Sequence, residues 1–408
     1  MCAFSLQKSA RQFKYTVAVI CCVIATGSQL VRADSTNTVA MDLTWAERMA
    51  QTTMLDHPEA WKMRKSDGEY RWAYTQGLVL TAIETLYHKT QKRHYFDYIQ
   101  AYADHYIDAE GNIATFKMDE FNIDSINAGK ILFNLYSATK SKKYLNAMML
   151  LRKQLDWHPR TSDGVFWHKL KYPWQIWLDG LYMAAPFYAQ YETQLGDPHQ
   201  LADVVRQFTV SEQKLRESNT GLLYHGWDES RIQQWADKDS GLSPSFWSRS
   251  LGWYAMALVD TLDYIPPDHP QRPTLINILK RLIDALIPYQ HSSGLWYQVT
   301  DQIERSGNYP EASATAMFTY AIAKGVRKQY LPSDYRKYAD RAFKGLTSKL
   351  MDVEVDGRLR LRQICRSAGL GGEPYRDGTF DYYIHTDIVT NDAHGVGAFI
   401  LAAVEMEY

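Results

Sequence analysis

One carboxylate stands inside an apolar stretch of the sequence. Asp179 lies in the segment Ile176–Met183, which reads IWLDGLYM. A carboxylate in such surroundings is costly unless it is paired or takes part in a reaction. An acid catalyst that works near neutral pH needs an apolar wall that favours its protonated form, and Trp177 and Met183 can form one. We therefore expect Asp179 to act as a general acid.

Two loops carry further polar and aromatic residues toward Asp179. The loop before it reads HPRTSDGVFWHKLKYP and the loop after the following helical segment reads GLLYHGWDES, so together they supply Trp167, His168, Lys169, His225, Trp227 and Asp228. An acidic substrate needs a fixed cation, for which Arg249, Lys169 and His225 are candidates. For each of these cations, an ordinary ion pair with a nearby acid is the alternative.

Other unusual residues lie at or near the starts of further apolar helical segments: Tyr74, Gln76, Asp124, Trp247, Arg249, Trp253, Asp392 and His394. For Asp124 and Asp392 a capping role explains the position equally well, because an aspartate at a helix start accepts hydrogen bonds from free backbone N–H groups.

The elements that must position these residues are helices. Six segments rich in small and apolar residues begin near Trp72, Asp124, Trp177, Trp247, Glu311 and Asp392. Six amphipathic segments alternate with them, near Trp45 and over residues 95–106, 143–155, 201–217, 273–289 and 333–350. One charged face is typical of helices with one side in water.

Six such pairs predict an all-α fold, an (α/α)6 barrel of two concentric rings. The repeat is longer than that of open solenoids, and neither end carries an obvious polar capping repeat. The starts of the inner helices would meet at one end of the barrel and form a funnel. Without a Pro/Gly/Ser-rich linker, residues 34–408 are expected to form a single catalytic domain.

The amino-acid composition limits the classes of molecule that the protein is expected to bind. The 408 residues carry a formal net charge of −1, which gives no general attraction to nucleic acid or an anionic membrane. The 12 Trp and 28 Tyr suit stacking on sugar rings, although most aromatic residues only pack. The sequence does not predict an oligomeric state.

The N-terminus predicts a secretory signal peptide over residues 1–33. Basic residues precede an apolar run over 15–25, and Val31-Arg32-Ala33 matches a cleavage site before Asp34. The run is too short to span a membrane. We expect a secreted or periplasmic protein without a membrane anchor. A lipoprotein signal at Cys21 or Cys22 lacks the small residue expected before the cysteine. Cleavage would leave one cysteine, Cys365, and so no internal disulfide.

Metal and cofactor motifs are missing from the sequence. It contains no HExxH, Walker A or GxSxG string, and His158, His168 and His225 lack the spacing of helical metal ligands. The glycine-rich stretch Gly369–Gly372 follows no convincing strand, so it is weak evidence for a dinucleotide site. No metal ion or cofactor is expected.

Several strings resemble a known family. QIWLDGLYMAAPF, HGWDES, FWSRSLGWYAMALVDTLDYIP, YPEASATAMFTYAIAKGVR and NDAHGVGAFILAAVE are similar to motifs of the unsaturated rhamnogalacturonyl hydrolases, glycoside hydrolase family 105. The resemblance runs from about Trp72 to the C-terminus. It implies an (α/α)6 barrel that removes a uronic acid with a C4–C5 double bond from the non-reducing end of pectin-derived oligosaccharides.

The resemblance also implies a mechanism other than the usual two-carboxylate scheme. Such enzymes hydrate the double bond, and Asp179 matches the aspartate that both donates the proton and activates water. Asp124 matches a second site aspartate. The positions matching the sugar pocket are Tyr74, Lys169, His225, Trp247, Arg249 and Trp253, with Arg249 and His225 expected to face the uronate.

Three alternatives remain open. An unsaturated glucuronyl hydrolase would use the same barrel and chemistry on other oligosaccharides. A sugar epimerase shares the barrel but relies on histidine pairs, whereas the inner helices here offer mainly Asp and the single His394. A glycan-binding protein with a decayed site is disfavoured, because Asp124, Asp179 and Arg249 are all present.

Overall fold

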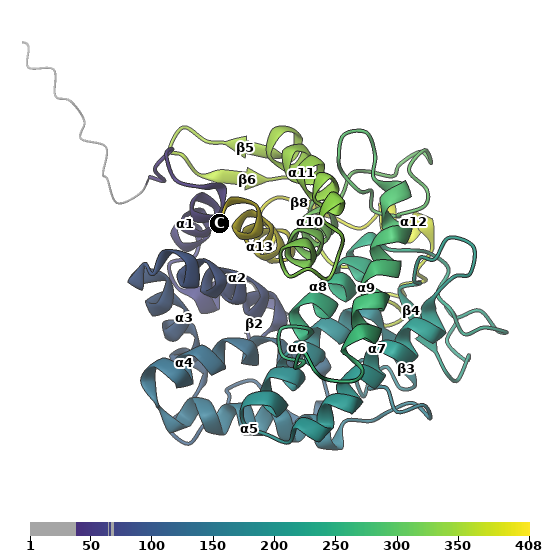
Figure 1. Cartoon of the computed structure of the whole chain (residues 1–408), viewed down its shortest axis with the longest axis horizontal. Helices are drawn as coiled ribbons and strands as arrows, with labels where there is room; N and C mark the ends of the chain where they lie inside the picture. Colours follow the sequence, from purple (N-terminus) through teal and green to yellow (C-terminus); the bar gives the residue numbers. More distant parts are fainter. Residues whose placement is uncertain (1–37, 64, 67–68) are drawn as a thin grey trace, which may run out of the picture. The chain divides into compact units, whose positions relative to one another are not determined.

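Six segments of small and apolar residues form an inner ring of helices. In the computed structural model these are α2 (Tyr74–Thr90), the 3-10 segment η3 (Ile123–Lys130) continued by α4 (Ile131–Thr139), α6 (Leu178–Gln194), α8 (Ser248–Thr261), α10 (Ala312–Arg327) and α13 (Ala393–Glu407). Each inner helix packs against the next, and α13 returns to α2, so the ring is closed (Figure 1). The structure describes residues 38–63, 65–66 and 69–408, so the predicted signal peptide lies outside the described residues.

Six amphipathic helices surround this ring (Figure 1). They are α1 (Trp45–Asp56), α3 (Arg93–Tyr106), α5 (Lys142–Trp157), α7 (Leu201–Leu215), α9 (Arg272–Leu286) and α11 (Arg336–Gly345). In this order they pack on α13, α2, α4, α6, α8 and α10. Their apolar faces cover the inner ring and their charged faces meet water. The predicted (α/α)6 barrel is confirmed, and Thr38–Tyr408 forms one unit.

The remaining elements are short. Four antiparallel strand pairs join β1 (Lys65–Ser66) to β2 (Glu69–Tyr70), β3 (Gln175–Trp177) to β4 (Gly226–Asp228), β5 (Met351–Val353) to β6 (Leu359–Leu361), and β7 (Ile364–Cys365) to β8 (Ile388–Val389). The other helices are α12 (Phe380–Ile384), the 3-10 turns η1 (Ala60–Lys62), η2 (Met118–Glu120), η4 (Pro198–Gln200), η5 (Ile287–Tyr289) and η6 (Ser333–Tyr335), and the π-helix η7 (Leu346–Leu350).

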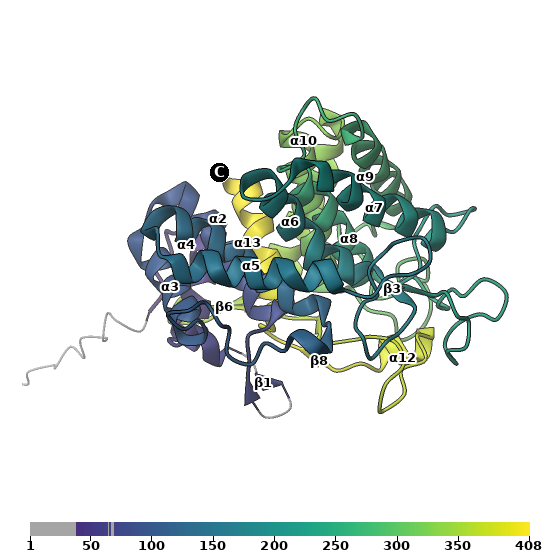
Figure 2. The same ribbon diagram turned by 90° about the horizontal axis from the view of Figure 1, so that it is seen from below.

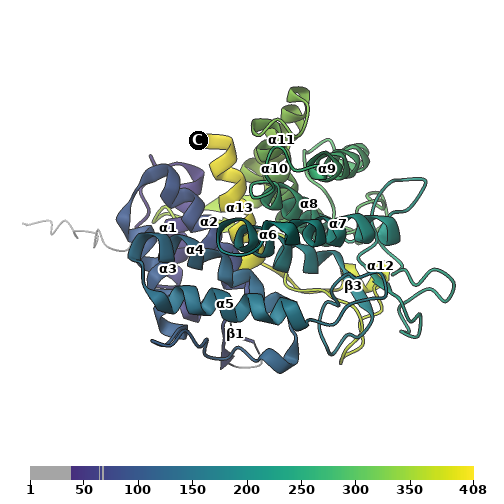
Figure 3. The same ribbon diagram turned by 60° about the horizontal axis from the view of Figure 1, so that its bottom comes forward.

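The short strands and loops gather at the end of the barrel where the inner helices start. Figures 2 and 3 show β1, β3 and α12 on one side of the helices, and the C-terminal end of α13 on the other. The funnel of helix starts expected from the sequence is therefore lined by these connections.

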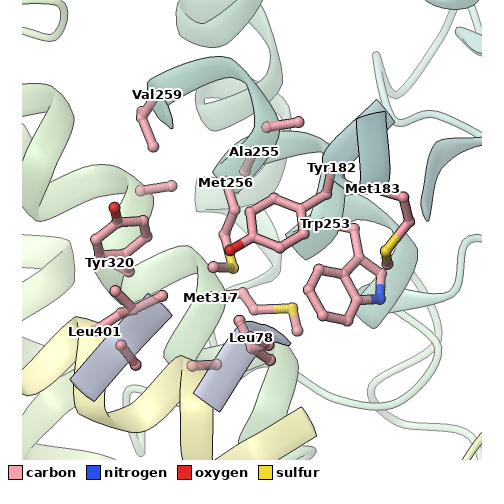
Figure 4. Packing of buried hydrophobic residues seen from close by; sticks show 14 of the residues in the cluster. Leu78, Tyr182, Met183, Trp253, Ala255, Met256, Val259, Met317, Tyr320 and Leu401 are labelled. Carbon is pink, nitrogen blue, oxygen red and sulfur yellow. The ribbon is translucent and has the colours of Figure 1, made fainter. Parts of the chain in front are cut away.

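The interior of the inner ring is filled by apolar side chains. Trp253 packs on Tyr182 with ring centroids 4.9 Å apart, and Met183 and Met317 lie beside it (Figure 4). The ring closes tightly because small residues face each other: a Cβ atom on Gly77 would lie 2.6 Å from the Cα of Ala128. Only glycine permits this approach of α2 to η3.

Candidate active site

A polar pocket of about 300 Å³ opens where the inner helices start. The starts of α2, η3 and α6, the loop before β3 and the loop after β7 contribute its walls. Four of the predicted site residues line it, Tyr74, Asp124, Lys169 and Asp179, together with Arg71, Gln76, Asn122, His168, Tyr172, Trp177, Met183, Ser367, Ala368 and Arg376 among others.

The ladder of β3 and β4 brings Asp179 and His225 together. Trp177 pairs with Gly226 across the ladder, and the Leu178 backbone N–H donates to the His225 carbonyl at 3.0 Å. His225 Nε2 consequently lies 3.2 Å from Asp179 Oδ2. Both atoms are buried and neither makes a hydrogen bond of good geometry. Since Oδ2 is shielded by the imidazole, Oδ1 is the oxygen of Asp179 that can reach a substrate in the pocket.

Two aromatic residues hold His225 behind Asp179. Its Nδ1 lies 2.7 Å from the hydroxyl of Tyr383, and Trp247 lies 4.9 Å from the imidazole, centroid to centroid. Burial raises the pKa of Tyr383 well above its usual value, so this phenol stays neutral. A neutral hydroxyl can donate to Nδ1 or accept from it, which allows either imidazole tautomer to face Asp179.

Asp124 forms an ion pair inside the pocket. Its Oδ2 lies 2.5 Å from Lys169 Nζ, and both side chains are largely buried. Burial acts to raise the pKa of Asp124, but the nearby basic side chains together outweigh it, with the charge and hydrogen bond of Lys169 foremost, and hold the pKa below its ordinary value. The capping alternative does not hold for Asp124, because Asn122 caps η3 by accepting from the Asp124 N–H at 3.1 Å.

His168 lies beside Asp124 and is neutral near pH 7. Its Nε2 is 3.6 Å from Asp124 Oδ1, and its ring stacks on Trp177 with centroids 4.4 Å apart. Burial lowers the pKa of His168 to about 4, although Asp124 opposes the shift. Of the two basic side chains beside Asp124, only Lys169 therefore neutralises it at physiological pH.

The residues that the sequence left undecided have structural partners. Asp392 caps α13 and accepts from the His394 N–H at 3.1 Å, as the capping interpretation required. It also lies 2.5 Å from His394 Nδ1, and His394 Nε2 lies 2.8 Å from the Tyr74 hydroxyl. This chain of contacts orients Tyr74 at the pocket. Cys365 is buried, and burial raises the pKa of its thiol to about 11, so it stays protonated.

Four of the predicted sugar-binding residues are not among those that line the pocket. His225 and Trp247 lie behind Asp179, and Trp253 packs within the inner ring (Figure 4). Arg249 is 1% exposed, with Nη2 3.3 Å from Glu311 Oε1 and Nε donating to Ser313 Oγ at 2.8 Å. Arg249 therefore forms an ordinary ion pair with a nearby acid, and the contact of Arg249 with a uronate stays a prediction.

Sequence reasoning missed several residues of this site, and three of them bear on its chemistry. Tyr172 and Arg376 line the pocket, and Tyr383 orients His225. Arg376 follows the glycine-rich stretch Gly369–Gly372, which is weak evidence for a dinucleotide site. That glycine cluster, with a basic residue just after it, was the available signal for a polar loop near the site.

The part of the chain that the structure describes holds no group of three or more His, Cys, Asp or Glu side chains arranged to bind a metal ion. Within those same residues, no helix combines the length and hydropathy needed to cross a bilayer. The arrangement provides one carboxylate with an open oxygen, Asp179, and one paired with a cation, Asp124. Such a pair can donate a proton, activate water and orient a sugar hydroxyl.

Known proteins share this architecture. The chain is 43% identical to a family 105 glycoside hydrolase from C. acetobutylicum ATCC 824, with a TM-score of 0.86 over 90% of this chain and 99% of that one. It is 26% identical over 297 residues to the unsaturated rhamnogalacturonyl hydrolase YesR of Bacillus subtilis, covering 71% of this chain and 79% of YesR. The unsaturated glucuronyl hydrolase of Bacillus sp. GL1 shares the fold, with a TM-score of 0.64 at 14% identity over 89% of this chain and 95% of that one.

The family assignment follows from the extent of these matches. The family model described as Glycosyl Hydrolase Family 88 matches residues 45–408, which include every helix described above. The predicted resemblance to family 105 is confirmed by the C. acetobutylicum enzyme. The chain therefore belongs to glycosyl hydrolase family 88 and is a glycoside hydrolase related to the enzymes of family 105.

Proposed function

We propose that this enzyme releases the 4,5-unsaturated uronic acid from the non-reducing end of rhamnogalacturonan oligosaccharides. The observation that carries the proposal is the Asp179 carboxylate, with one oxygen shielded by His225 and the other open to a polar pocket. The relationship to YesR, whose name specifies this activity, supports the substrate class.

The reaction adds water across the C4–C5 double bond. Asp179, protonated, transfers its proton to C4, which leaves positive charge on C5 and the ring oxygen. The resulting carboxylate then takes a proton from a water molecule whose oxygen bonds to C5. The hemiketal formed at C5 opens to a ketone, and the hemiacetal left at C1 collapses and releases the aglycone alcohol. Asp179 regains its proton in each turnover, so one residue serves as acid and base.

The neighbouring residues orient these steps. His225 limits Asp179 to one working oxygen, and the Asp124–Lys169 pair offers an acceptor and a donor for sugar hydroxyls. Tyr172 stacks on the buried Trp177 with ring centroids 4.9 Å apart, and its half-buried ring offers an aromatic surface that a sugar ring can contact.

The test follows the ultraviolet absorbance of the conjugated double bond in lyase-digested rhamnogalacturonan. The absorbance should decay with the wild-type enzyme, and Asp179→Asn should slow the decay at least about a thousandfold, because proton donation and water activation are both removed. Asp156→Asn, which alters a surface carboxylate, is the matched control. The absence of decay with wild type, or full decay with Asp179→Asn, refutes the proposal.

A substrate panel tests the sugar itself. The lyase reaction removes the C4 hydroxyl at which galacturonic and glucuronic acid differ, so unsaturated galacturonyl-rhamnose and unsaturated glucuronyl disaccharides carry the same unsaturated uronyl group and differ in the aglycone and its linkage. We expect the larger kcat/KM for the galacturonyl-rhamnose substrate. The reverse order would reassign the enzyme to unsaturated glucuronyl substrates while leaving the chemistry of Asp179 intact.

A further inference from the structure

The pocket contains three basic side chains that are charged at neutral pH, and two of them are already neutralised. Lys169 Nζ lies 2.5 Å from Asp124 Oδ2, and Arg71 Nη2 lies 3.2 Å from Glu69 Oε2. The third, Arg376, has no acidic partner within ion-pair distance among the residues that the structure describes. An anionic substrate group that enters the pocket therefore meets one uncompensated positive charge.

The guanidinium of Arg376 is held in a fixed orientation. Its Nε donates to the Gly371 carbonyl at 2.6 Å, and Nη2 donates to the Tyr172 hydroxyl at 2.8 Å and to the Leu370 carbonyl at 3.1 Å. Within the described part of the chain Nη1 takes part in none of the assigned hydrogen bonds. A rigid guanidinium with unused N–H groups is well suited to bind a carboxylate.

The glycine-rich stretch makes room for this side chain. A Cβ atom on Gly369 would lie 2.5 Å from Arg376 Nη1, and one on Gly372 would lie 2.9 Å from Nη2. Gly371 and Gly372 also adopt positive φ angles of 62° and 81°. The loop thus wraps the guanidinium with its backbone, which explains the glycine cluster without a dinucleotide.

We propose that Arg376 determines specificity by binding the carboxylate of the unsaturated uronyl group through Nη1. The assignment rests on the proposed function. It differs from the expectation for Arg249, whose guanidinium is buried against Glu311 and does not line the pocket. Arg376 Cζ lies 6.0 Å from the centroid of the Trp177 ring, and Arg376, Trp177 and Asp179 line the same pocket.

The experiment compares an unsaturated uronyl disaccharide with its methyl ester, which keeps the double bond and loses the charge. Arg376→Gln should lower kcat/KM for the acid roughly 10- to 100-fold, as expected for one charged hydrogen-bonding partner, and mainly through KM. For the ester, kcat/KM should stay within about twofold. Arg366→Gln removes a charge from the start of the same loop, outside this pocket, and should leave kcat/KM unchanged for both substrates.

Arg376→Lys retains the charge and should recover part of the preference for the acid. An equal loss of kcat/KM for acid and ester in Arg376→Gln leaves the acid-to-ester ratio unchanged; it would show that Arg376 only holds the loop and would overturn the proposal, as would the absence of any loss.

Calorimetric binding of both compounds to Asp179→Asn, with and without Arg376→Gln, separates this proposal from the proposed function. Preference for the acid that disappears with Arg376→Gln supports the Arg376 assignment even if wild type turns over neither compound. Equal binding of acid and ester to Asp179→Asn overturns it, whatever the turnover.

Discussion

Replacing Lys169 by methionine isolates the ion pair that holds Asp124 charged. The Nζ–Oδ2 distance of 2.5 Å corresponds to an attraction of about 7 kcal/mol at an effective dielectric constant of about 20, part of which offsets the desolvation of both groups. Removing one partner of a buried pair costs about 3 to 5 kcal/mol. Because the pair borders an open pocket, we expect Lys169→Met to lower the free energy of unfolding by about 3 kcal/mol at pH 7.5.

The loss should depend on pH in a defined direction. In the wild type the pKa of Asp124 lies below its unfolded value, so its stabilisation is complete above the unfolded pKa and is lost only as pH falls through the folded pKa. Without Lys169, burial dominates and raises the pKa of Asp124 above the unfolded value. His168, whose pKa is lowered to about 4, does not replace the lost charge. Stability of the variant should therefore fall as pH rises, and its deficit should be smaller at pH 4.5 than at pH 7.5.

Urea unfolding at pH 4.5, 6.0 and 7.5 measures this deficit. Lys280→Met is the matched control, since Lys280 lies 2.7 Å from Asp284 with both side chains more than 40% exposed, and it should lose less than about 1 kcal/mol at every pH. Adding Asp124→Asn to Lys169→Met should recover most of the lost free energy of unfolding, because it removes the unpaired charge. A deficit as small as that of the control, or one independent of pH, would show that Lys169 does not hold Asp124 charged.

Two further predictions concern the barrel itself. Burial raises the pKa of Glu84 to about 8, so the folded protein keeps this carboxyl protonated where the unfolded chain releases the proton, and stability should fall between pH 5 and 7. Thermal unfolding at several pH values measures this fall, and Glu84→Gln should make the melting temperature depend less on pH. The same dependence of the melting temperature on pH in the variant and the wild type would contradict the prediction. Gly77→Ala places a methyl group 2.6 Å from the Cα of Ala128, and should lower the free energy of unfolding by about 1 to 3 kcal/mol. Urea midpoints that match wild type would show that α2 moves away from η3 freely.

The two rings were predictable because each helix carries its own signal. A residue of an inner helix is buried on nearly every side, whereas an outer helix alternates apolar and charged faces, and both patterns are local. The predicted starts near Trp72, Trp177 and Trp247 lie within two residues of the observed starts of α2, α6 and α8. The second inner helix differs, since it opens as the 3-10 segment η3.

The site was only partly predictable for the same reason. Asp179 stood out as a carboxylate within a local apolar run. The partners that orient the site come from distant segments: Tyr383 lies 158 residues from His225, and Arg376 lies 204 residues from Tyr172. No local spacing reports such contacts. An aromatic residue such as Trp253 is also ambiguous, because the same side chain suits a sugar pocket and a packed core.

Arg249 shows how a residue can matter to the site without lining its pocket. Its guanidinium donates to the Cys365 carbonyl, while Glu311 accepts from the Cys365 N–H at 2.9 Å and from the guanidinium. One buried ion pair therefore fixes β7, from which the loop to Arg376 continues. A buried ion pair is retained only when its remaining polar atoms are satisfied, and here the strand backbone satisfies them. Loss of activity on replacing Arg249 would follow from a displaced loop as well as from a lost substrate contact. Only the ratio of activity on the acid to that on the ester separates the two, because a displaced loop lowers both activities and a missing carboxylate partner lowers only one.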